Sequence, residues 1–291
     1  MQSEVRYFST LPLSDDLPTC LTFPCVTAEA WNFATINPQH KVCCLSLTAE
    51  PRVPVWPWGA PPNLDSQVWS SSPSLPYGDG SVDIASSRSI ALTLRAHDWP
   101  PFLRDCARIL KPQGILSISV LDPMPRNAGP LLQQWTTEYL ILGLERRFLA
   151  TRPAMVIPFW LKDVSQLTLP HIKTVTFSAV ANDDTDMVDA VSPGLMGISE
   201  SYSGPTWVHR RRRSDIQQLG TAVGRHFYQA LYKELASEAR LRRPRISGVE
   251  YANDIIHHWW WKDPAIVREC REYGTMFEMV TYTCLKRDSV S

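Results

Sequence analysis

The chain has little glycine, with 13 glycines among 291 residues, and no excess of charge of either sign. Scarce glycine argues against an enzyme built on glycine-rich phosphate-binding loops, because such loops need several residues without a side chain. The 29 basic and 29 acidic residues give a formal net charge of +0. This balance argues against a general nucleic-acid binder, which normally carries a large basic excess.

Long apolar runs and leader-like segments are also missing. The longest near-continuous apolar run, at 139–144, is far shorter than the roughly 20 residues that a membrane helix needs. The opening segment MQSEVRYFST has neither the basic nor the apolar region of a secretory signal. We therefore expect no membrane span and a cytoplasmic, or nuclear, location.

Metal-binding and disulfide patterns are absent from the sequence. The 7 cysteines include no C-x-x-C pair, and there is no H-E-x-x-H, G-x-S-x-G or Walker pattern. Without a secretory signal a disulfide framework is not expected, and the sequence predicts no metal site. Most of the cysteines lie in apolar stretches, where a small buried side chain is the expected role.

Short apolar runs alternate with amphipathic segments along the first 180 residues. The arm at 51–66 is rich in proline and tryptophan, and its prolines exclude a central strand or helix there. Apolar runs and helical spacing predict strands at 20–23, 41–47, 68–70, 82–86, 115–121 and 172–180, and helices at 28–35, 99–110 and 131–148. Such alternation indicates an α/β fold with a mostly parallel sheet covered on both faces.

The last third of the sequence looks different. Residues 181–213 are polar and irregular, which predicts an insertion loop. Ser214 then caps a long helix, and 214–272 reads as a helical cover that includes helices at 254–261 and 264–272. A closing strand is predicted at 275–286.

Two consecutive strings carry a family resemblance. LPYGDGSVDIASSRSI at 75–90 and HDWPPFLRDCARILKPQGILSISVLDPMP at 97–125 resemble the second half of a class I S-adenosylmethionine-dependent methyltransferase domain. The positions that fall on that pattern are Asp83, Leu103, Arg108, Leu110, Lys111, Pro112, Gly114 and Leu116. Stretches at 146–148, 152–160 and 269–278 are similar to fungal methyltransferase-like proteins.

The resemblance implies one methyltransferase-like domain over residues 1–291. Its fold would be Rossmann-like, with a mostly parallel twisted sheet, helices on both faces and an antiparallel C-terminal strand. S-adenosylmethionine would be the cofactor, and a small molecule, such as a fungal secondary metabolite, would accept the methyl group.

The first 68 residues depart from the family's cofactor motifs. CLTFPCVTA at 20–28 replaces the glycine-rich turn, and Pro24 lacks the N–H that could face a ligand. By the resemblance, Ser46 stands where a ribose-binding carboxylate is expected, and Ser72 stands near the adenine. A carboxylate that accepts two ribose hydroxyls is worth about 1.5–3 kcal/mol. We therefore expect weak cofactor binding by a degenerate site formed by Phe23, Cys25, Ser46, Ser72 and Ser86. Cys25 is either a reactive thiol in this site or an inert buried one.

Candidate catalytic and substrate-binding residues follow the predicted strands. Asp122 could be a general base or the cap of the next helix, and Arg88 could clamp a substrate carboxylate or form a surface ion pair. His257 could also deprotonate an acceptor, with His258 and tryptophans lining its pocket. The alternative is that these side chains divide between core and surface, because neighbours on a helix point about 100° apart. Trp135 and Trp160 are the further candidates for substrate contact, with a place in the core as the alternative. Asp83 is either a family position or a structural turn acid.

Three functions stay open at this point. The first is methyl transfer to a small molecule. The second is a catalytically inactive pseudo-methyltransferase that regulates a protein partner, for which the arginine runs at 210–213 and 240–245 are a candidate acidic-partner or import patch. The third is a repurposed fold that catalyses cyclisation or isomerisation. A solvated loop is the alternative for the arginine runs.

Overall fold

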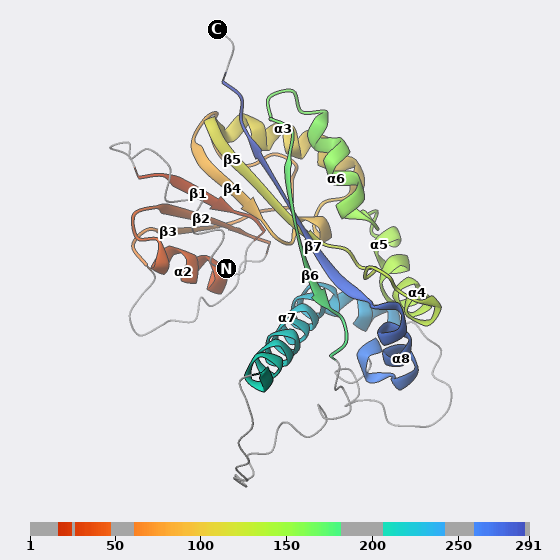
Figure 1. The fold of residues 1–291 in the computed structure, drawn as a ribbon. Coiled ribbons are helices and arrows are strands. Elements are labelled where there is room, and N and C mark those ends of the chain that lie inside the picture. Colours follow the sequence, from red (N-terminus) through yellow and green to blue (C-terminus); the bar gives the residue numbers. More distant parts are fainter. Residues whose placement is uncertain (1–16, 25–26, 48–60, 182–205, 242–258, 289–291) are drawn as a thin grey trace. The chain divides into compact units, whose positions relative to one another are not determined.

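A computed structural model describes residues 17–24, 27–47, 61–181, 206–241 and 259–288. Seven strands form one sheet in the order β3-β2-β1-β4-β5-β7-β6 (Figure 1). The strands are β1 Thr19–Thr22, β2 Lys41–Ser46, β3 Leu64–Val68, β4 Val82–Ser87, β5 Leu110–Leu121, β6 His171–Ser178 and β7 Met276–Leu285. The sheet is mostly parallel, and the C-terminal strand β7 is antiparallel, which confirms the fold class expected from the sequence.

The parallel register brings strand ends to one edge. Thr22 of β1 lies opposite Cys44 of β2 and Ser86 of β4. In β2 every residue from Val42 to Ser46 is buried, the pattern of a strand covered on both faces. Since ligands of open α/β sheets bind outside the carboxyl ends of the strands, this edge is where a site is expected.

The described residues form seven α-helices. They are α2 Thr27–Ile36, α3 Trp99–Ile109, α4 Pro130–Thr136, α5 Leu142–Arg146, α6 Pro153–Lys162, α7 Thr206–Leu241 and α8 Pro264–Tyr273. The helix predicted at 99–110 is confirmed, and its apolar positions Phe102, Leu103, Cys106 and Ala107 are all buried. No helix among the described residues is both long and apolar enough to cross a membrane.

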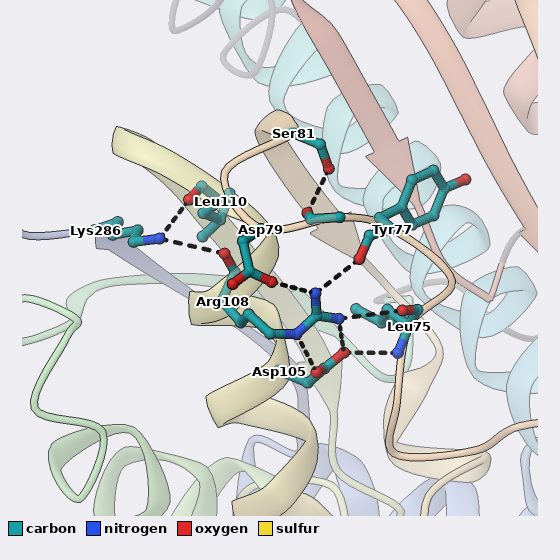
Figure 2. A network of polar contacts seen from close by, with 9 residues as sticks. Leu75, Tyr77, Asp79, Ser81, Asp105, Arg108, Leu110 and Lys286 are labelled. Atoms are coloured by element: carbon teal, nitrogen blue, oxygen red, sulfur yellow. Dashed lines mark hydrogen bonds and ion pairs between the residues drawn. The ribbon is translucent and has the colours of Figure 1, made fainter.

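A guanidinium ties the loop before β4 to helix α3 (Figure 2). Arg108 donates to Asp105 at 2.7 Å and to Asp79 at 2.8 Å, and also to the carbonyls of Tyr77 and Leu75 at 2.8 and 3.2 Å. Asp105 in turn accepts from the Leu75 N–H at 2.6 Å. The two carboxylates raise the pKa of Arg108, so this clamp stays charged. The network therefore fixes the path of the chain into β4.

The chain divides into two compact units. The first comprises residues 1–120, 148–173 and 280–291, and the second comprises 121–147 and 174–279. The first unit holds β1 to β4, α3 and α6 with most of the apolar core. The reading of residues 1–291 as a single domain stays a prediction.

In the second unit, helix ends are satisfied by side chains. Buried Glu269 of α8 accepts from the N–H groups of Leu131 and Leu132 at 2.8 and 3.0 Å, and so caps the start of α4. Helix α8 begins with Asp263 as its N-cap and ends at Gly274, whose φ of 61° is the left-handed conformation that glycine favours. The helix predicted at 264–272 is confirmed.

Three boundary predictions were wrong. Strand β3 starts inside the predicted arm 51–66 and ends at Val68, where the expected strand at 68–70 would begin. It lies at the edge of the sheet and most of its residues are exposed, so its sequence shows no apolar pattern. Helix α7 begins at Thr206, inside the predicted loop 181–213. Trp260–Lys262 forms a 3-10 turn instead of the end of a helix at 254–261, whose residues 254–258 lie outside the described part.

Two helical features were not foreseen. The helix predicted at 131–148 is interrupted by a π-helical turn, Thr137–Ile141, between α4 and α5. Helix α6 was not predicted at all, because Pro158 lies inside it and its apolar residues cover more than one face.

Candidate active site at the carboxyl edge of the sheet

Three of the predicted cofactor residues meet at the carboxyl edge of the first unit. The Phe23 N–H donates to the Ser86 carbonyl at 3.0 Å, which extends the pairing of β1 with β4 by one residue. The Ser46 carbonyl, at the end of β2, accepts from the Trp69 N–H at 2.7 Å. The parallel register therefore places Phe23, Ser46 and Ser86 at neighbouring strand ends, as the sequence predicted.

The ring of Phe23 belongs to the core. The residue is fully buried, and its ring lies edge-on to Phe102 at 5.5 Å and to Trp69 at 6.5 Å between centroids. Edge-to-face pairs of this kind stabilise the packing of aromatic residues. Phe23 thus stabilises the core beneath this edge, and its N–H is already used by the Ser86 carbonyl. Trp69 was not predicted as a site residue, although it lies within the strand expected at 68–70.

The segment after β3 is shaped by serines. Ser72 accepts from the Ser74 N–H at 3.2 Å through its hydroxyl, which closes a turn, and Ser71 has a left-handed φ of 56°. Ser87, at the end of β4, accepts from the Ile90 N–H at 3.3 Å. Neither Ser71 nor Ser87 was predicted as a site residue. The edge is therefore lined with hydroxyls.

In the second unit, Asp122 lies between two anchored carbonyls. The Tyr232 hydroxyl of α7 donates to the Leu121 carbonyl, and the Tyr228 hydroxyl donates to the Pro123 carbonyl. Burial raises the pKa of both tyrosines, so they remain neutral donors, and the charge of Asp122 adds to the shift of Tyr232. Helix α7 thus fixes the backbone on both sides of a half-buried carboxylate.

The remaining predicted residues are scattered. Trp160 stacks on buried Trp99 at 5.3 Å in the first unit, a core contact, and Arg88 is exposed after β4. In the second unit Trp135 stacks on Tyr139 at 4.9 Å. Cys25, His257 and His258 lie outside the described residues.

Comparison with known proteins supports the assignment suggested by this topology. The family model described as a methyltransferase domain matches residues 55–118. No curated protein matches the chain in sequence. The chain has the class I methyltransferase fold.

Two solved structures illustrate this likeness. A protein of Galdieria sulphuraria assigned as a sarcosine dimethylglycine methyltransferase is 14% identical, with a TM-score of 0.51, and the match covers 99% of this chain and 84% of that one. Phosphoethanolamine N-methyltransferase 2 of Haemonchus contortus, solved with phosphomonomethylethanolamine and S-adenosylhomocysteine, is 10% identical, with a TM-score of 0.50. That match covers 99% of this chain and 52% of the other.

The described residues of this methyltransferase fold do not fit S-adenosylmethionine well. Recognition of a ribose normally uses a carboxylate at a strand end, and close approach to a cofactor normally uses glycines after the first strand. The described ends of β1 to β4 offer neither: Ser46 is buried with 7% exposure, and Pro24 has no N–H to donate. The Pro24 carbonyl also accepts from the Ser89 hydroxyl at 3.3 Å, which ties this segment to the residues after β4.

Asp83 has a structural role at the opposite, amino edge of the sheet. Its carboxylate accepts from the Thr19 N–H at 2.8 Å and from Lys111 at 2.9 Å. A hollow of about 720 Å³ at this edge is lined by Lys41, Asn63 and Lys111 among others. The Asn63 amide donates to three backbone carbonyls, and Lys111 is bonded to Asp83. Both of these side chains that line the hollow therefore stabilise the fold.

The described cysteines are buried, as the sequence predicted, and none of them is paired in a disulfide. Burial raises the pKa of Cys20 to about 12 and the pKa values of Cys270 and Cys284 to about 11. Such thiols stay neutral near pH 7 and are poor nucleophiles. The described residues also include no group of three or more side chains that could hold a metal ion.

Proposed function

We propose that this methyltransferase-fold chain is a pseudo-methyltransferase, a binding protein that does not transfer methyl groups from S-adenosylmethionine. The observation that carries the proposal is the chemistry of the carboxyl edge. At the described ends of β1 to β4 there are hydroxyls and a proline where a cofactor site would need a carboxylate and glycines. We infer that the fold is kept for recognition of a partner.

The expected loss of affinity for S-adenosylmethionine is large enough to be measured. Loss of one charge-assisted contact to the ribose costs about 1.5–3 kcal/mol, or roughly ten- to a hundredfold in affinity. A proline in the turn removes a further donor. Together these changes would move a micromolar cofactor into the millimolar range.

An enzyme is the second candidate, and the anchoring of Asp122 favours it. A carboxylate held between two fixed carbonyls is preorganised to take a proton from a hydroxyl or amine. Such a base could serve methyl transfer to a small acceptor, which the match to a methyltransferase-domain model favours. It could equally serve a cyclisation or isomerisation that needs no methyl donor.

Titration calorimetry with S-adenosylmethionine and S-adenosylhomocysteine separates these candidates. We expect no saturable heat with the wild-type chain up to about 1 mM ligand. A micromolar dissociation constant would overturn the proposal and make methyl transfer the leading function.

A gain-of-function variant sharpens the test. Ser46→Asp supplies the missing carboxylate, and Ser70→Asp, on an exposed residue of the next segment, is its matched control. If the edge keeps the shape of a cofactor pocket, the Ser46 variant gains measurable binding and the Ser70 variant does not. Far-UV circular dichroism of both variants verifies that the added charge leaves the fold intact.

The free thiols of the described cysteines suit a reducing cellular compartment. Structural cysteines stay reduced in the cytosol and nucleus, and the described cysteines are all free. We propose a cytoplasmic or nuclear site of action, which imaging of a fluorescent fusion would test.

A further inference from the structure

Helix α6 exposes two large apolar side chains on its outer face. Its inner residues Pro153, Ile157 and Leu161 are buried, whereas Met155 and Phe159 are exposed to 62% and 66%. No charged residue occurs from Pro153 to Leu161. The outward positions of a surface helix normally carry polar or charged side chains, so two large apolar residues one turn apart call for an explanation.

Basic residues frame this apolar pair. Lys162 lies over the Phe159 ring, with its Nζ atom 5.8 Å from the ring centroid, so both share the outer face. Arg152 is the N-cap residue, three positions before Met155. A cation at a helix N-terminus opposes the helix dipole, so helix stability does not explain Arg152.

An exposed aromatic residue precedes the helix. Phe148 is 68% exposed and has a left-handed φ of 58°, a strained conformation for a bulky residue. Its carbonyl accepts from the Ala96 N–H at 2.8 Å, which holds it there. Strain that is kept on an exposed aromatic side chain points to a role outside the folded core.

The helix is rigidly mounted. Pro158 has no N–H, so the Ala154 carbonyl loses its partner within the helix, and the Tyr282 hydroxyl of β7 donates to that carbonyl instead. Trp160 stacks on Trp99 at the other end of the helix. A face that is already ordered loses little conformational entropy when it binds.

We propose that the α6 face, formed by Arg152, Met155, Phe159 and Lys162, docks a helical segment of a partner protein that carries two apolar side chains flanked by carboxylates. Charge complementarity selects this partner. From Phe148 to Lys173 the sequence has three residues of permanent positive charge, Arg152, Lys162 and Lys173, against one acid, Asp163. The ten residues of α6 span about 15 Å, so the contact is small and the complex is transient.

The probe is a labelled helical peptide with two leucines one turn apart, two glutamates at each end, and alanine and glutamine elsewhere. Fluorescence anisotropy with the full chain measures its binding. We expect saturation below about 1 mM and a loss of at least tenfold in affinity in the Met155→Ser/Phe159→Ser variant. Leu219→Ser, at a residue of α7 with 65% exposure, is the matched control and leaves the affinity unchanged.

Charge reversal tests the selectivity. Arg152→Glu/Lys162→Glu is expected to lose the acidic peptide and to bind a peptide with lysines in place of the glutamates. The proposal is overturned if no peptide saturates, or if all variants bind alike. It is also overturned if the Met155 and Phe159 variant instead abolishes binding to phosphatidylcholine–phosphatidylserine vesicles, or self-association in sedimentation velocity. None of these readouts depends on S-adenosylmethionine, so the failure of this proposal is distinct from that of the proposed function.

Discussion

The hydroxyl of Tyr282 substitutes for the N–H that Pro158 lacks, and a double-mutant cycle can measure this exchange. Tyr282 is buried with 2% exposure, and its hydroxyl donates to the Ala154 carbonyl. In Tyr282→Phe the carbonyl loses its donor while the ring stays in place. We expect a loss of about 1.5–2 kcal/mol in the free energy of unfolding, since a carbonyl left without a partner costs more than the average hydrogen bond.

The second arm of the cycle restores the donor within the helix. Pro158→Ala places an N–H four residues after Ala154, so the carbonyl is served by the ordinary helical bond. In that background Tyr282→Phe is expected to cost only about 0.5 kcal/mol. The coupling energy between the two positions is therefore about 1–1.5 kcal/mol.

Urea denaturation followed by tryptophan fluorescence measures the four stabilities, and hydrogen exchange of the α6 amides gives the local readout. Tyr273→Phe, at an exposed tyrosine of α8, is the control and leaves the stability unchanged. If the two substitutions are additive, with Tyr282→Phe costing the same in both backgrounds, the hydroxyl does not replace the proline's missing donor and the reasoning is refuted.

Two further predictions concern charge and pH. Arg108→Gln should lower the free energy of unfolding by about 2–3 kcal/mol in urea denaturation, because it removes contacts to two carboxylates and two carbonyls. The control Arg104→Gln, on the exposed side of the same helix, should change the free energy of unfolding by less than about 0.5 kcal/mol. Burial raises the pKa of Cys20 from 9.0 to about 12, so its stabilising contribution is complete below pH 9 and falls as the pH rises toward 12. The free energy of unfolding should therefore drop between pH 8 and 10.5, and Cys20→Ala should make this drop shallower; equal slopes would contradict the assignment.

Much of the fold could be predicted because the strands that form its centre are short, apolar and buried on both faces. The segment KVCCLS and the strand after Ser81 show this pattern directly. Strand β3 could not be placed, because an edge strand with exposed Asp65, Ser66 and Gln67 has no apolar signature. Helix α6 was hidden for a different reason: the contact that makes Pro158 tolerable comes from Tyr282, more than a hundred residues away.

The candidate site was only partly accessible from the sequence. The edge position of Phe23, Ser46 and Ser86 follows from parallel pairing and could be predicted. That the Phe23 ring packs on Trp69 and Phe102 could not, since it depends on which way a side chain turns at a strand end. The anchoring of Asp122 by two tyrosines of α7 was equally invisible, because no spacing in the sequence links residues so far apart.

The two edges of the sheet carry different side chains. Carboxylates paired with cations gather where strands begin: Asp83 holds Lys111 and the Thr19 N–H, and Asp105 with Asp79 holds Arg108. The described carboxyl ends of β1 to β4 instead carry hydroxyls and aromatic rings. Substitutions at the first edge should therefore lower stability without changing ligand selectivity, whereas substitution of the half-buried Ser72 at the second should change selectivity at little cost in stability. The proposed loss of methyl transfer rests on this contrast, because a cofactor site would need a carboxylate at the second edge, where the described ends of β1 to β4 carry hydroxyls.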